Sequence, residues 1–211
     1  MDISTHIDIF ERIKESKLMK KILLLLAEGF ETYEASVFID VMGWNLMEGD
    51  GSTILESCGF SREVKTSFGQ KAIADHLIEE IKVSDYDALA IPGGFEEFGF
   101  YDQAYDERFL SLIREFHAEG KPIAAVCVAA LPIGKSGILK GKKGTTYNQN
   151  PQRQQALRDF GVNVQQQPIV ETENVITSWN PSTAMPVAYR LLEMLTSKQN
   201  ADKVRKLMGF Q

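Results

Sequence analysis

Cysteine and histidine are both scarce in this chain of 211 residues. The two cysteines are Cys58 and Cys127, and the three histidines are His6, His76 and His117. Two cysteines cannot form the disulfide framework of a secreted domain, and such sparse use is typical of the reducing cytoplasm. The histidines are scattered, and no Cys-x-x-Cys or His-x-x-x-His pattern occurs, so the sequence predicts no metal site.

Long apolar runs and an excess of positive charge are also missing. No apolar run approaches the about 20 residues that span a bilayer, and residues 1–18 lack the apolar core of a secretory signal. The net charge of −6 disfavours nucleic acid or an anionic membrane as the main partner. Pro92-Gly93-Gly94 is too short a signal for a phosphate loop, so we expect no cofactor. The sequence therefore predicts a cytoplasmic protein that binds neither nucleic acid nor membrane.

What the sequence does have is the composition of one soluble α/β domain. Hydrophobic residues make up 44% and charged residues 25%, and 211 residues leave little room for a second domain. Buried strands are predicted at 22–26, 88–91 and 123–126, with helical patterns between them. This alternation favours a single domain with one mostly parallel sheet and helices on both faces.

Two local predictions concern the segment after the first strand. A helix is expected over 33–42, ending at Gly43 because glycine commonly stops helices. The next segment, 44–62, is expected to be irregular, with its glycines interrupting two short strand candidates.

Residues 1–18 look like an addition to a domain that covers 19–211. Ile3, Ile7, Phe10 and Ile13 fall near helical spacing and are separated by charged residues. The segment is either a helix that docks on the body or on a partner, or the product of an upstream start codon. An apolar face here would need cover, which is one reason to expect a homodimer.

The stretch 123–134 predicts the functional centre. A buried strand runs directly into a helical pattern without a polar loop, which places Cys127 at the corner between them. The positive end of the helix dipole is then expected to lower the pKa of this cysteine. The alternative is a small buried side chain, as most unpaired cysteines are. Glu34, in the first turn of an earlier helix, and Gly94 also follow strands, and ligands bind at the carboxyl ends of parallel strands.

The sequence resembles the ThiJ/PfpI superfamily, flavodoxin-like proteins related to class I glutamine amidotransferases, from Lys20 to Phe210. Members include a protein deglycase and intracellular proteases. The segments that carry the resemblance are, in chain order, Ala27-Glu28-Gly29-Phe30-Glu31 with Glu34 and Asp40, Tyr86-Asp87-Ala88-Leu89 through Pro92-Gly93-Gly94, Ala124-Ala125-Val126-Cys127, and Asn180-Pro181-Ser182-Thr183-Ala184.

The resemblance implies a role for several positions. Cys127 matches the family's elbow cysteine, and Glu34 matches the carboxyl that hydrogen-bonds its sulfur. Gly94 and Val128 match the positions whose backbone N–H groups form an oxyanion hole. A glutamate in contact with a thiolate is expected to be protonated. The remaining pocket residues are Tyr147, Asn180 and Pro181.

Two departures from the family pattern affect the expected chemistry. Relatives often have a histidine near the position of Tyr147 or directly after the cysteine, where this chain has Val128. No histidine follows Cys127, so a Cys–His dyad of the protease kind is in doubt. Ala129 replaces a glycine of many relatives, which narrows the pocket slightly.

Three functions follow from these residues. The first is glyoxalase- or deglycase-like chemistry, in which Cys127 adds to a small carbonyl or acyl compound and Glu34 moves protons. The alternative is a cysteine-based redox sensor, or a stress-protective or chaperone-like protein without turnover. An intracellular peptidase or amidase is the least favoured, because the histidine is missing. The sequence leaves open whether the pocket turns over a substrate.

Overall fold

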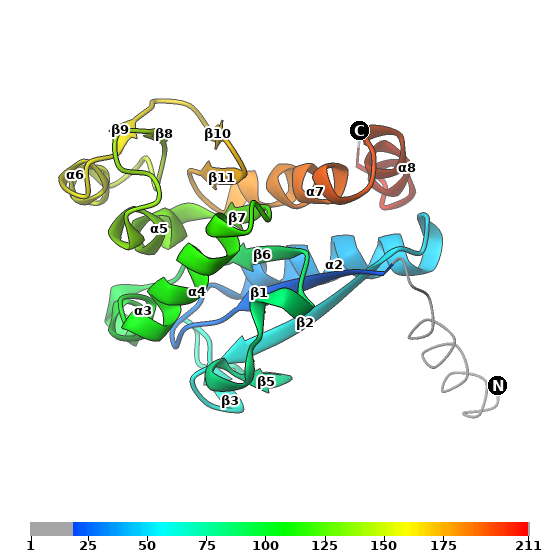
Figure 1. The fold of residues 1–211 in the computed structure, drawn as a ribbon, viewed down its shortest axis with the longest axis horizontal. Coiled ribbons are helices and arrows are strands. Elements are labelled where there is room, and N and C mark those ends of the chain that lie inside the picture. Colours follow the sequence, from blue (N-terminus) through cyan, green and yellow to red (C-terminus); the bar gives the residue numbers. More distant parts are fainter. Residues whose placement is uncertain (1–18, 211) are drawn as a thin grey trace.

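A seven-stranded sheet forms the centre of the computed structural model, which describes residues 19–210 (Figure 1). In spatial order its strands are β10 (Ile169–Thr172), β11 (Val175–Ser178), β7 (Ile123–Ala125), β6 (Ala88–Ile91), β1 (Lys20–Leu25), β2 (Thr53–Gly59) and β5 (His76–Leu77). All neighbours are parallel except β10, which pairs antiparallel with β11. The predicted single α/β domain with a mostly parallel sheet is confirmed.

Helices cover both faces of this sheet, as the layers in Figure 1 show. One face carries α2 (Thr32–Glu48), α7 (Ala184–Leu195) and α8 (Lys198–Leu207), and the other carries α3 (Phe100–Ala104), α4 (Glu107–Ala118), α5 (Ala130–Ser136) and α6 (Pro151–Asp159). Two small sheets lie outside the layers: β3 (Glu63–Lys65) with β4 (Lys71–Ile73), and β8 (Lys143–Gly144) with β9 (Asn163–Val164).

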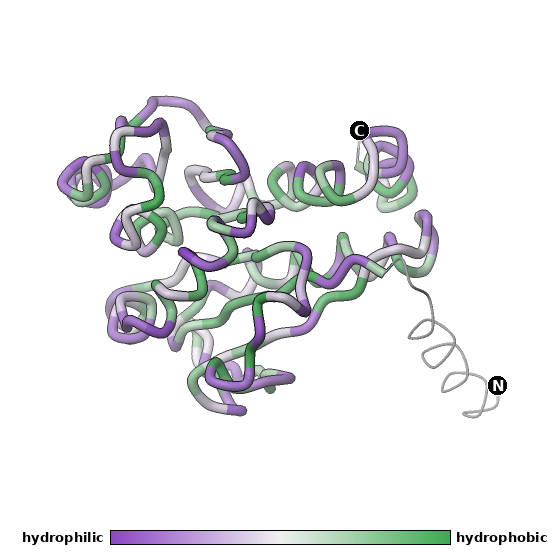
Figure 2. The backbone as a smooth tube through the Cα atoms, in the orientation of Figure 1, coloured by the Kyte–Doolittle hydropathy of each residue, from purple (hydrophilic) through white to green (hydrophobic). Residues whose placement is uncertain are grey.

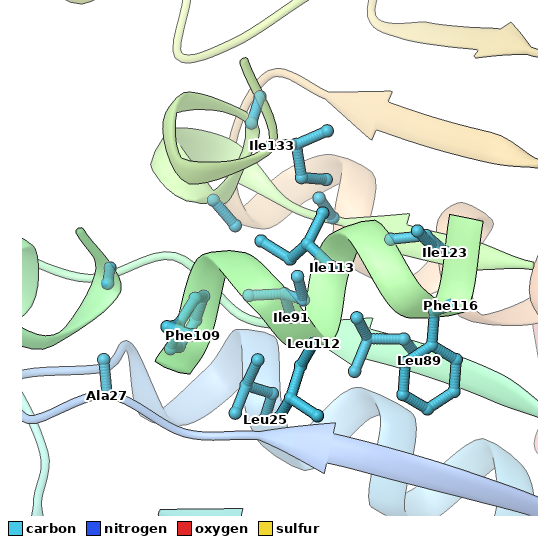
Figure 3. Close-up of a cluster of buried hydrophobic side chains, with 14 of the residues drawn as sticks. Leu25, Ala27, Leu89, Ile91, Phe109, Leu112, Ile113, Phe116, Ile123 and Ile133 are labelled. Atoms are coloured by element: carbon cyan, nitrogen blue, oxygen red, sulfur yellow. The ribbon is translucent and has the colours of Figure 1, made fainter. Parts of the chain in front are cut away.

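Strand β1 shows why there are two cores rather than one. Successive strand residues point to opposite faces. Leu23 and Leu25 therefore pack on the side of α4 with Phe109 and Phe116, the cluster drawn in Figure 3. Ile22 and the other alternate residues pack on the side of α2 and α7. Figure 2 shows the result: the central strands are hydrophobic and the outer turns are hydrophilic.

The prediction that the first helix ends at Gly43 is wrong, because α2 continues to Glu48. A Cβ at Gly43 would meet nothing within 4 Å, so the glycine lies on an open surface of the helix. An exposed helical glycine costs only about 1 kcal/mol, and Asn45 offsets this. Its buried amide donates to Thr53 Oγ1 at 2.9 Å and its carbonyl accepts from Asn200 Nδ2 at 2.6 Å.

The segment 44–62 is also more regular than predicted. Its first residues belong to α2, and Thr53–Gly59 forms one strand, β2, paired with β1 along its length. The glycines lie at the borders of these elements rather than in the middle of strands: Gly49 caps α2, and Gly59 is the last residue of β2. A Cβ at position 59 would lie only 2.7 Å from Val64 Cγ2, so the close packing there requires glycine.

The predicted extension, residues 1–18, lies outside the described residues. Within residues 19–210, no helix combines the length and apolar character needed to cross a bilayer.

Candidate active site

Cys127 occupies a strained corner between β7 and α5. Its backbone has φ = 60°, in the left-handed region that residues other than glycine rarely adopt. A short 3₁₀ turn, Cys127–Ala129, follows and leads into α5 at Ala130. The corner is held by the Thr146 hydroxyl, which donates to the Cys127 carbonyl at 3.0 Å. A strained backbone conformation of this kind is kept only where the surrounding structure holds it in place, and such positions are often found at functional sites.

Glu34 reaches the same place from the first turn of α2. The side chain of Glu31 caps this helix by accepting a hydrogen bond from the Glu34 backbone N–H at 2.8 Å. The Glu34 carboxyl is fully buried, and its Oε2 accepts from the Gly93 N–H at 2.7 Å. Its other oxygen, Oε1, is buried and has no hydrogen-bond partner of regular geometry within residues 19–210. The same side chain interacts with Cys127.

Burial governs the protonation of both groups. It raises the pKa of Glu34 to about 8, although the Gly93 N–H opposes the shift. Burial also raises the pKa of the Cys127 thiol, and the charge of an ionised Glu34 raises it further, while the Val128 N–H acts in the opposite direction. Glu34 is therefore mostly protonated at neutral pH, as expected for a carboxyl beside this sulfur.

The prediction that the helix dipole lowers the pKa of Cys127 is wrong. Helix α5 begins at Ala130, so the 3₁₀ turn separates the sulfur from the helix axis. A single hydrogen bond from Val128 does not offset burial combined with a neighbouring carboxyl.

Two consecutive glycines allow these groups to approach each other. A Cβ at Gly93 would lie 2.8 Å from Glu34 Oε2 and 3.0 Å from Cys127 Cβ. A Cβ at Gly94 would lie 2.4 Å from the Phe100 ring. The turn after β6 can therefore lie this close to Glu34, Cys127 and Phe100 only as glycine.

A cleft of about 270 Å³ opens above this pair. Six of the seven residues singled out in the sequence line it: Glu34, Gly94, Cys127, Val128, Tyr147 and Pro181. Asn180, the seventh, is placed beside the cleft, where its side chain caps the turn that presents Pro181 and donates to Asn148 Oδ1 at 3.0 Å.

Other lining residues were missed in the sequence: Glu31, Phe95, Glu96, Glu97, Tyr101, Asn150 and Arg153. They come from the cap of α2, from the turn after β6, from α3 and from the start of α6, which the fold brings together. Only the acidic run after Gly94 carried a local signal. The rest are ordinary surface residues in the sequence.

The histidines in the described part of the chain lie away from the cleft. His76 Nε2 contacts Glu56 Oε2 at 3.0 Å, and His117 Nδ1 contacts Asn174 Oδ1 at 2.8 Å. Within residues 19–210, no group of three or more His, Cys, Asp or Glu side chains is arranged to hold a metal ion.

The flavodoxin-like arrangement, a mostly parallel sheet between two layers of helices, places the chain in the class of the ThiJ/PfpI superfamily. Within that class the chain belongs to the DJ-1/PfpI family, whose sequence profile matches residues 20–194.

Individual relatives agree with this assignment. Protein DJ-1 homolog B of Arabidopsis thaliana is 29% identical over 187 residues, which cover 88% of this chain and 40% of that protein. The chain thus spans less than half of this plant relative. Deglycase PfpI of Pyrococcus furiosus is 27% identical over 127 residues, covering 60% of this chain and 72% of that protein. The crystal structure of Drosophila melanogaster DJ-1beta superposes with a TM-score of 0.80 at 26% identity, covering 92% of this chain and 99% of that one.

Proposed function

We propose that this protein is a cysteine-dependent enzyme that converts small carbonyl compounds, with glyoxalase- or deglycase-like chemistry on 2-oxoaldehydes. The observation that carries the proposal is the contact between Cys127 and a buried Glu34 whose pKa is raised to about 8. A carboxyl with a pKa near the working pH both accepts and returns protons. The name of the Pyrococcus relative, a deglycase, supports the same chemistry.

The proposed reaction begins with addition to the aldehyde carbon. Ionised Glu34 takes the thiol proton as Cys127 sulfur bonds to that carbon. The carbonyl oxygen receives hydrogen bonds from the Gly94 and Val128 backbone N–H groups and then a proton, which gives a hemithioacetal. Glu34 then moves a proton from the first carbon to the second through an enediol, and the resulting thioester is hydrolysed by water. The net change is the addition of one water to a 2-oxoaldehyde to give a 2-hydroxy acid.

A peptidase is a weaker fit to the same cleft. Amide hydrolysis requires an acid that protonates a leaving amine, a role that histidine commonly fills. The cleft has Tyr147 where relatives often carry a histidine, and the two described histidines are engaged elsewhere with Glu56 and Asn174. A phenol is also a poor base near neutral pH, so it does not replace histidine in taking the proton from a thiol.

The direct test is turnover of methylglyoxal, followed by its loss and by the appearance of lactate. We expect wild type and Cys58→Ser to be active and Cys127→Ser to be inactive. Wild-type activity should rise with pH through about 8, because the ionised form of Glu34 accepts the thiol proton. Equal activity of wild type and Cys127→Ser, or no activity in wild type, would refute the proposal.

One observation favours a second function, a redox sensor. Glu34 Oε1 is buried beside Cys127 and has no regular hydrogen-bond partner among the described residues, so a protonated Glu34 could donate to an oxygen carried by the sulfur. Peroxide would convert the thiolate to a sulfenate and then to a sulfinate, releasing one water at each step. Mass spectrometry after mild peroxide treatment should then show two added oxygens on Cys127 in wild type and fewer in Glu34→Ala.

We also propose that the protein is a cytoplasmic homodimer. Ile39, Trp44 and Met47 of α2 are 50%, 41% and 64% exposed and line one shallow groove together, and contiguous apolar surface of this kind is typical of an interaction site. Light scattering should give a dimer for the full chain, and a monomer for Trp44→Glu. A monomeric full chain would contradict this.

A further inference from the structure

Arg153 spans the mouth of the cleft that holds Cys127. It lies in the first turn of α6, where Asn150 caps the helix by accepting from the Gln152 N–H at 2.9 Å. Its Nη2 donates to Glu96 Oε2 at 2.5 Å, which ties α6 to the turn after β6. The Arg153 side chain is only 24% exposed, whereas Glu96 is 62% exposed. The arginine therefore lies on the inner side of this ion pair.

An aromatic platform fixes the orientation of the guanidinium. Its central carbon lies 4.9 Å from the centre of the Tyr101 ring. That ring is held in turn by Phe100 at 5.3 Å and Tyr105 at 4.9 Å between centroids. A guanidinium stacked on a clamped ring keeps its plane, so its N–H groups keep fixed directions.

Most of the hydrogen-bonding capacity of Arg153 is unused. A guanidinium has five N–H donors, and within residues 19–210 its only side-chain hydrogen bond is the one to Glu96. Among the described residues that line the cleft, Arg153 is the one positively charged side chain, and besides Glu34 three glutamates line it: Glu31, Glu96 and Glu97. The cleft therefore offers fixed donors for an oxygen together with an excess of negative charge.

We propose that Arg153 selects the substrate: it donates to the second oxygen of a small neutral dicarbonyl compound whose reacting carbon meets Cys127, while Glu96 and Glu97 disfavour the corresponding 2-oxo acids. This assignment rests on the proposed carbonyl chemistry. Tyr101 is a positioning residue that acts through the arginine. Glu96 already neutralises the charge of Arg153, so a neutral oxygen can accept a hydrogen bond from an unused N–H group without electrostatic repulsion. A carboxylate would bring a further negative charge into a cleft that Glu31, Glu96 and Glu97 also line.

The charge preference can be measured without any turnover, by alkylating Cys127. Iodoacetamide and iodoacetate have similar size and transfer the same kind of group to sulfur with loss of iodide, but only iodoacetate is anionic. The rate ratio of amide to acid reagent, divided by the same ratio for N-acetylcysteine, reports the field in the cleft. We expect this corrected ratio to be about three- to tenfold in wild type. Values near 1 would overturn the charge preference.

Four variants assign that ratio to particular groups. Glu96→Gln removes one acid and frees Arg153, so the ratio should fall at least threefold. Arg153→Gln removes the base, so the ratio should rise. Tyr101→Phe keeps the ring and loses only a hydroxyl that has no partner among the described residues, so it should behave as wild type. Tyr101→Leu should move the ratio toward that of Arg153→Gln. A change in Tyr101→Phe but not in Tyr101→Leu would overturn the platform role.

Protection of Cys127 against iodoacetamide tests the second oxygen. Methylglyoxal and propanal both present an aldehyde, and only methylglyoxal has an adjacent carbonyl. The half-protecting concentration of propanal, divided by that of methylglyoxal, should be about tenfold larger in wild type than in Arg153→Gln. Comparing this ratio between the two proteins cancels the different intrinsic reactivity of the two aldehydes. An unchanged ratio in folded Arg153→Gln would overturn the proposal. Since protection requires only reversible addition, an enzyme without turnover would still give a clear answer.

Discussion

The two cysteines of this chain both lie near the carboxyl ends of parallel strands, yet Cys58 is fully buried and Cys127 is half-buried. Cys58, near the end of β2, packs in the hydrophobic cluster below α4, and burial alone raises the pKa of its thiol. Cys127, after β7, shares part of this burial but also contacts Glu34, the Val128 N–H and an open cleft. Burial by itself makes a thiol inert. Burial beside a group that takes and returns a proton can make it a catalyst.

The largest difference between the two cysteines is expected in methylglyoxal turnover when each sulfur is replaced by oxygen. Cys127→Ser should lower methylglyoxal turnover by at least about 10³-fold, because a hydroxyl is a far weaker nucleophile than a thiol. Cys58→Ser should leave turnover within about twofold of wild type, since Cys58 does not line the cleft. The measurement is kcat/KM on folded protein. Comparable losses in both variants would remove the distinction.

Removing the Glu34 carboxyl should leave Cys127 without turnover, like Cys58, but should not slow its alkylation. Glu34→Gln cannot transfer protons, so turnover should fall by about 10²–10⁴-fold. An ionised Glu34 raises the pKa of Cys127. The neutral amide should therefore lower this pKa and speed alkylation above pH 8 by several fold. Stopped-flow alkylation from pH 6 to 10 measures this, and slower alkylation of Glu34→Gln above pH 8 would contradict the pairing.

The same carboxyl should make stability depend on pH. Its pKa is about 8 when folded and 4.5 as the reference for the unfolded chain. The folded state thus binds the extra proton between these values, so its stabilisation is complete below pH 4.5 and is lost as pH rises through 8. At about 1.4 kcal/mol per pH unit, wild type should lose about 5 kcal/mol across this window of 3.5 units. Urea unfolding of Glu34→Gln should lack this loss, and parallel profiles would refute it.

The smallest effect is expected from removing the sulfur of Cys58, the cysteine without a neighbouring carboxyl. Cys58→Ala leaves a small void in a tightly packed cluster and should cost about 1–2 kcal/mol in unfolding free energy without changing methylglyoxal turnover. Iodoacetamide should also label Cys127 well before Cys58 in native protein, as peptide mapping by mass spectrometry can show. Faster labelling of Cys58 would reverse the assignment of the two residues.

The sequence predicted the parts of the site that follow from chain order. A strand that turns at once into a helical pattern placed Cys127, and a charge in the first turn of the helix after the first strand placed Glu34. The sequence could not predict Arg153 and Tyr101, because they reach the cleft from helices that are separate in the chain and meet only through tertiary packing. Nor could it predict the raised pKa of Cys127, since a local helix argument omits burial.

The continuation of α2 past Gly43 has a similar cause. Local propensity favoured a stop at glycine, and the buried hydrogen bonds of Asn45 with Thr53 and Asn200 outweighed it. Two of these three residues lie within ten positions of each other, but the third comes from α8, 155 positions away. A preference of about 1 kcal/mol is easily overridden by such a contact.

Cys127 packs against both hydrophobic clusters, one on each face of the sheet. A molecule that binds its sulfur therefore touches a point where both layers meet, and it is held only by the folded chain. By mass action, reversible adducts should raise the melting temperature in proportion to the logarithm of their concentration over their dissociation constant. Thermal-shift screening of carbonyl libraries against wild type and Cys127→Ser would then rank ligands before any product is known.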